Sequence, residues 1–67
     1  MDVDGYVKQI MDTPDWEGSV IIEAYPDGRV EVWWEKDDHA GIGPDVVAPT
    51  VLAAVSEAAA TIGKQNN

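Results

Sequence analysis

Hydrophobic and polar residues alternate on both sides of a short turn near the middle of the chain. The turn is residues 25–29 (YPDGR), and the runs around it are rich in β-branched and aromatic residues, which favour pleated strands. Proline presets φ for a type I turn, and glycine accepts the left-handed conformation that closes a three-residue loop. The pattern predicts an antiparallel hairpin with strands over residues 18–25 and 29–36.

A three-residue loop also fixes which residues of the two strands face each other. It places Ile21 opposite Trp33 and Glu23 opposite Glu31, with side chains alternating between the two faces of the hairpin. One face is then entirely apolar and is the predicted core face, made of Val20, Ile22, Ala24, Val30, Val32 and Trp34.

The other face of the hairpin is mixed, with a large apolar pair beside two carboxylates. Glu23 and Glu31 lie directly opposite, which is destabilising for like charges, and we expect both to be open to water. An aromatic residue ringed by carboxylates is typical of a contact surface; alternatively, Trp33 only covers its own hairpin. The residues predicted to bind a partner are Ile21, Glu23, Tyr25, Glu31, Trp33, Glu35, Asp37 and Asp38.

Helical periodicity appears before and after the hairpin. Residues 2–12 carry apolar side chains at helical spacing, with an acidic residue available as N-cap and Thr13-Pro14 as a stop.

Residues 45–62 form the second predicted helix, with Asp45 as N-cap, Pro49 in the first turns and Gly63 as C-cap before a frayed tail at 64–67. Few charges lie on this Ala-rich helix, so we expect more than one of its faces to be covered, which is a hint of self-association.

The order of these elements predicts an α+β fold over one small domain, residues 1–67, in which two helices pack on one antiparallel hairpin. A chain of 67 residues without cysteine has only a small core and no disulfide to support it. We therefore weigh a monomer against a symmetric dimer, which would extend the sheet to four strands.

The charge of the chain narrows the range of partners. Thirteen acidic residues against four basic ones give a net charge of −9, which disfavours binding to nucleic acid or anionic lipid and favours a basic protein. The alternative is that the acidic surface serves only solubility. Neither a membrane-spanning run nor a signal peptide is recognisable, so we expect a cytoplasmic protein.

Residues suited to catalysis or metal binding are scarce. Asp37, Asp38 and His39 are consecutive, and consecutive loop residues rarely converge on one ion. The acidic start, residues 2–5 (DVDG), lacks the glutamate that a calcium loop needs at its twelfth position. No nucleophile with a base at hand is present. We predict no metal, no cofactor and no enzymatic activity.

Two functions of different classes fit these features. The first is a small acidic module that binds a basic protein through the outer face of the hairpin; one version is an inhibitor that occupies a nucleic-acid-binding surface. In size and charge alone it is similar to small phage-encoded inhibitors, which would place it in the host cytoplasm. The alternative is a structural or self-assembly accessory protein whose apolar patch is buried in a homo-oligomer.

Overall fold

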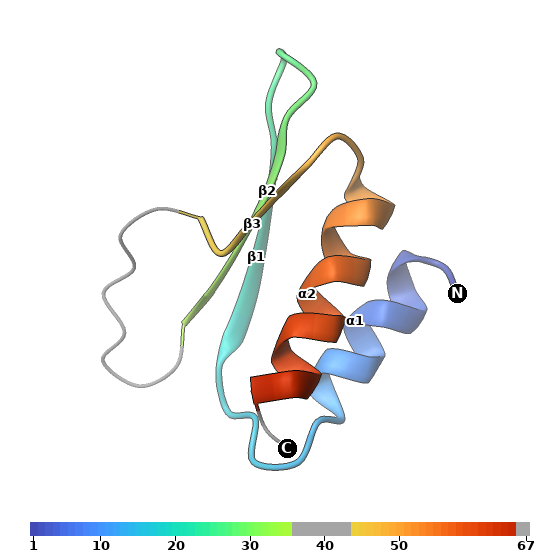
Figure 1. Ribbon diagram of the computed structural model, residues 1–67, viewed down its shortest axis with the longest axis vertical. Helices are drawn as coiled ribbons and strands as arrows, with labels where there is room; N and C mark the ends of the chain where they lie inside the picture. The colour runs from blue at the N-terminus through green and yellow to red at the C-terminus, as the bar shows by residue number, and fades with distance from the viewer. Residues whose placement is uncertain (36–43, 66–67) are drawn as a thin grey trace.

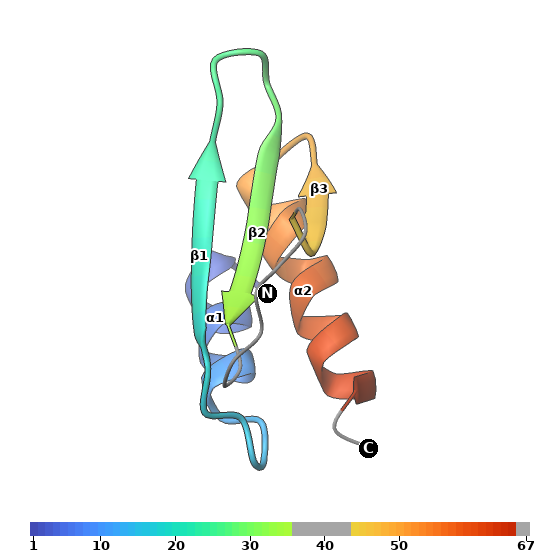
Figure 2. The same cartoon turned by 90° about the vertical axis from the view of Figure 1, so that its left-hand side faces the viewer.

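The computed structural model describes residues 1–35 and 44–65 of the chain. Over these residues it contains helices α1 (Val3–Met11) and α2 (Val51–Gln65) and strands β1 (Ser19–Ala24), β2 (Val30–Glu35) and β3 (Val46–Ala48). The strands form an antiparallel sheet in the order β1-β2-β3. Both helices lie on the same side of this sheet (Figures 1 and 2). The α+β class is confirmed, and the sheet has one strand more than predicted.

The hairpin forms as the sequence predicts. Its register pairs Ile21 with Trp33 and Glu23 with Glu31, and the whole ladder from Ser19–Glu35 to Ala24–Val30 is in the predicted alignment. At the turn, the Tyr25 N–H donates to the Arg29 carbonyl at 2.9 Å. Gly28 has φ of 91°, the left-handed conformation that a glycine adopts without steric cost.

The first helix is also confirmed. The Asp2 carboxylate accepts a hydrogen bond from the Gly5 N–H at 2.8 Å, so Asp2 is the N-cap. The helix ends at Met11 with Asp12 as its C-cap. Ile10 is its one buried residue.

The second helix begins later than predicted, because Val46–Ala48 form strand β3 and not its first turn. Thr50 is the residue that caps α2, since its Oγ1 accepts from the Ala53 N–H at 3.1 Å. At its other end, α2 continues through Gly63, which therefore is not the predicted C-cap. The prediction failed because an Ala-rich helical pattern was extended back across a short β-branched run.

Asp45, predicted as a helix cap, instead joins the start of β3 to β2. Its N–H donates to the Val32 carbonyl at 2.9 Å, and its Oδ2 accepts from the Trp34 N–H at 2.9 Å. The side chain thus satisfies the backbone N–H of Trp34, which lies on β2 beyond the N-terminal end of the three-residue strand β3.

Replacing Asp45 with alanine should lower the free energy of unfolding by about 1–2 kcal/mol, because the Trp34 N–H loses its acceptor in a partly buried place. Asp45→Asn keeps an acceptor oxygen and should recover much of the loss. Urea unfolding followed by circular dichroism measures both. Equal stability of Asp45→Ala and the wild type would show that this bond contributes nothing.

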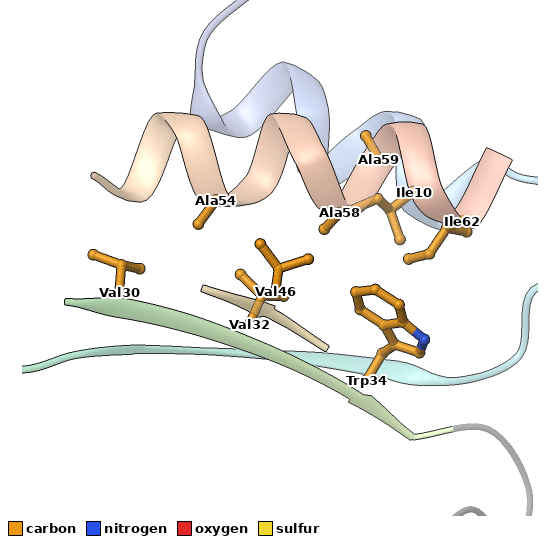
Figure 3. Packing of buried hydrophobic residues seen from close by; sticks show 9 residues of the cluster. All are labelled: Ile10, Val30, Val32, Trp34, Val46, Ala54, Ala58, Ala59 and Ile62. Atoms are coloured by element: carbon orange, nitrogen blue, oxygen red, sulfur yellow. The ribbon is translucent and has the colours of Figure 1, made fainter. Parts of the chain in front are cut away.

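The core lies between the sheet and the helices (Figure 3). It is formed by Ile10, Val30, Val32, Trp34, Val46, Ala54, Ala58, Ala59 and Ile62. Helix α2 contacts β2 and β3 on one side and α1 on another. The expectation that several of its faces are covered is therefore met within a single chain, so this feature no longer indicates self-association.

Candidate protein-binding face

The side of the sheet turned away from the helices is the candidate site, and we call it the outer face (Figure 1). The strand register and side-chain alternation place eight residues there that have described side chains: Ser19, Ile21, Glu23, Tyr25, Arg29, Glu31, Trp33 and Val47. Among the described residues, no helix covers this face. A surface that the fold itself does not use for packing is therefore available for another role.

Apolar side chains make up a large part of the outer face. Ile21 is 43% exposed and Val47 is 54% exposed. Trp33, opposite Ile21, is half-buried, and its indole N–H is buried without a hydrogen-bond acceptor among the described residues. Scattered exposed apolar residues are common, but Ile21 pairs directly with the half-buried tryptophan, and Val47 pairs with Glu31 two residues along the same strand.

Each of the two facing carboxylates has a partner in the next pair on the same face, Tyr25 and Arg29. Arg29 Nε lies 3.1 Å from a Glu31 carboxylate oxygen, and the Tyr25 hydroxyl donates to Glu23 Oε2 at 2.7 Å. The Arg29 guanidinium also stacks on the Tyr25 ring, 4.4 Å from its centroid. We call these four residues the carboxylate cluster. The cluster offsets the repulsion that the register forces on Glu23 and Glu31.

Glu31 differs from the prediction that both carboxylates are open to water, because it is only 9% exposed. It lies on the central strand, between Glu23 on β1 and Val47 on β3. With Arg29 beside it, this carboxylate is largely compensated within the chain. Glu23 remains exposed and is the carboxylate of the cluster that a partner can reach.

The hydrogen bond to Glu23, with burial and the two negative charges, raises the pKa of Tyr25 from 10.0 to about 12. The folded chain therefore holds this proton more tightly than the unfolded chain. The resulting contribution to stability is complete below the unfolded pKa of 10.0 and is lost as the pH rises through about 12.

Absorbance of tyrosinate in a Tyr6→Phe background, which leaves Tyr25 as the one tyrosine, should show this raised pKa. Glu23→Gln in that background should move the pKa of Tyr25 back toward its ordinary value, because the charge that favours the neutral phenol is gone. Glu17→Gln, an exposed carboxylate in the segment before β1, is the control and should leave the titration unchanged. A normal pKa of Tyr25 in the folded Tyr6→Phe chain would contradict the Tyr25–Glu23 bond.

The structure brings five of the eight predicted partner-binding residues together on the outer face: Ile21, Glu23, Tyr25, Glu31 and Trp33. Glu35 ends β2 opposite Ser19. Asp37 and Asp38 lie outside the described residues.

Val47 and Arg29 belong to this face but are not among the residues predicted to bind a partner. Val47 was assigned to a helix, and the signal that could have placed it was the short run Val46–Ala48 between Pro44 and Pro49. Prolines on both sides are typical of a short edge strand. Arg29 was recognised as a turn residue, and its position opposite Tyr25 already put it beside the acidic pair.

Metal-binding clusters and membrane-spanning helices are both absent from the described part of the chain. No cluster of three or more His, Cys, Asp or Glu residues there could hold a metal ion. Within residues 1–35 and 44–65, neither helix has the length and apolar character needed to cross a membrane.

Comparisons with protein-family models, with curated proteins and with solved structures find no match to this chain.

Proposed function

We propose that this chain is a non-enzymatic protein-binding module that attaches to a basic surface of another protein through its outer face. The observation that carries the proposal is the exposure of Ile21 and Val47, 43% and 54%, on a sheet face that neither helix covers. Apolar anchors at the centre of a patch with polar groups around them are typical of binding hot spots.

The charge of the chain supports a basic partner. The net charge is −9, and Glu23 lies exposed next to Ile21 on the strand at the edge of the face. Complementary charge speeds the encounter with a positive surface and disfavours acidic partners. Grooves that bind nucleic acid carry clustered Lys and Arg, so the finer form of the proposal is an inhibitor that occupies such a groove in the cytoplasm. A phage-encoded inhibitor acting on a host protein is one example of this class.

The proposal is tested by immobilising the chain, capturing partners from a lysate of its source cells, and measuring binding of the purified captured protein. Val47→Ser should weaken binding about tenfold, because it removes an anchor of the face. Leu52→Ser is the matched control, since Leu52 is similarly exposed at 46% but lies on α2. Added duplex DNA should compete if the partner surface normally holds nucleic acid.

Equal binding by the wild type, Val47→Ser and Leu52→Ser would contradict the outer face as the binding site. Binding that does not weaken with rising salt would contradict the basic partner, since contacts between exposed charges are screened. Both variants change exposed residues, so their circular dichroism spectra should match that of the wild type.

A second candidate function, self-assembly, is favoured by a separate observation, the unpaired outer edge of β1. The two functions overlap at Ile21, which lies both on β1 and on the outer face. Val47 lies on β3, at the other edge of the sheet, so self-association through β1 leaves that part of the outer face open to a partner.

A further inference from the structure

The two edges of the sheet are protected to very different degrees. Strand β3 forms one edge and is only three residues long, with Pro44 before it and Pro49 just after it. Strand β1 forms the other edge (Figure 2) and runs for six residues without proline, lysine or a bulge. Short strands, prolines and charges are the usual means of preventing edge-to-edge pairing, and β1 carries only Glu23.

The outward-facing backbone groups of β1 can be identified from the hairpin ladder. The Tyr25 N–H bonds to the Arg29 carbonyl, so the backbone groups of Glu23 and Ile21 also point toward β2, in alternation with their neighbours. The N–H and C=O groups of Val20 and Ile22 therefore point away from the sheet. None of the described residues bonds to them, and they form a free template for another strand.

We propose that a second copy of this chain pairs with β1 in an antiparallel, twofold-symmetric arrangement centred on Ile21. In that register Ile21 faces its own counterpart, Glu23 faces Ser19, and Val20 exchanges both backbone hydrogen bonds with Ile22. Residues that face each other in a pair without mutual hydrogen bonds come closest, so the two Ile21 side chains cover one another. A dimer with twofold symmetry uses one patch twice, as is most common for soluble homo-oligomers.

Two registers further along the strand are less complementary, and this comparison selects Ile21 as the centre of the pair. A centre at Ile22 places the Glu23 carboxylate opposite the apolar Ile21 side chain. A centre at Glu23 places the two Glu23 carboxylates directly opposite, where like charges destabilise a pair. On the outer face, of these three registers, only the one centred on Ile21 pairs apolar with apolar and leaves Glu23 opposite neither Ile21 nor its own counterpart.

The dimer forms a continuous six-stranded sheet in which the two outer faces lie side by side. This goes beyond the proposed function, because the partner then meets a face of twice the width and twice the charge. Each copy carries a net charge of −9, so the copies repel at long range. Rising salt shortens the screening length and should tighten the dimer, whereas it should weaken binding to a basic partner.

The test uses the intact chain and places charges at the symmetry axis of the dimer. Sedimentation then measures the mass of the particle in solution, monomer or dimer. Ile21→Glu and Ile21→Lys should each raise the dimer dissociation constant by about tenfold or more, because each faces its own like charge. An equimolar mixture of the two should form a heterodimer. Val47→Glu is the matched control, since Val47 is exposed on the same face but away from the β1 edge, and its dimer should persist.

A chain that is monomeric at all concentrations and salt levels overturns the proposal, as does a dimer that is indifferent to the substitutions at Ile21. Hydrogen exchange of the wild type gives a second measurement that needs no variant. The Val20 and Ile22 amides should become protected as the concentration rises, and fast exchange at a concentration where the mass is dimeric would place the interface elsewhere. Failure of the dimer leaves the Val47→Ser result intact, so the two proposals fail separately.

Discussion

Trp34→Ala should destabilise the fold by about 3–5 kcal/mol, the cost of removing a large aromatic side chain from a core. Trp34 is 7% exposed, and its ring extends from β2 toward the C-terminal half of α2, near Ile62 (Figure 3). A domain of 67 residues has a total stability of roughly 3–10 kcal/mol. The loss is comparable to the whole, so we expect a largely unfolded chain or a strongly lowered urea midpoint.

The neighbouring residue provides a control of identical chemistry. Trp33 lies on the outer face and is half-buried, so Trp33→Ala should cost only about 1–2 kcal/mol. Urea unfolding followed by far-ultraviolet circular dichroism compares the two variants without depending on tryptophan emission. If Trp33→Ala were the more damaging change, the assignment of the two faces of β2 would be reversed.

The hairpin could be predicted from the sequence because its determinants are local. Residues 25–29 dictate the turn, and the turn dictates the register, so alternation then assigns every side chain to a face. The pairing of Ile21 with Trp33 and of Glu23 with Glu31 follows from a few consecutive residues. The same holds for α1, whose N-cap is adjacent to the helix it begins.

Strand β3 could not be predicted with the same certainty, because its partner β2 is distant in the sequence. Val46–Ala48 reads equally well as a strand or as an extension of an Ala-rich helix when only local spacing is considered. What selects the strand is the pairing with β2, Val30 with Ala48 and Val32 with Val46, together with the Asp45 carboxylate on the Trp34 N–H. Thr50 directly before Val51 was the local signal for the true start of the helix.

The candidate site could therefore be predicted only in part. Its β1 and β2 residues follow from the hairpin register, whereas the burial of Glu31 depends on its place in a central strand. With β3 present, Glu31 has Val47 on one side and Glu23 on the other, which no hairpin alone provides. The accessible negative charge of the face therefore lies toward β1, the same strand whose edge is unpaired.

Ile10→Ala should destabilise the chain by about 2–5 kcal/mol, as is usual for removing a buried isoleucine side chain. Ile10 is fully buried and is the one buried residue of α1, and it lies between α1 and the core beside α2 (Figure 3). Helix α1 contacts α2 more extensively than it contacts the sheet. The substitution should therefore weaken the attachment of α1 as a unit.

Met11→Ala is the matched control for this prediction, because Met11 follows Ile10 on the same helix but is 45% exposed; its cost should stay below about 1 kcal/mol. Urea unfolding measured by circular dichroism and by tryptophan fluorescence then separates two outcomes. Coincident transitions at a lower midpoint mean that α1 is part of one cooperative unit with the sheet and α2. An early loss of helical signal, with Trp34 still buried, means that α1 detaches first as a local unfolding unit. Equal stability of the Ile10 and Met11 variants would contradict the docking of α1 on α2, through which Ile10 joins the core.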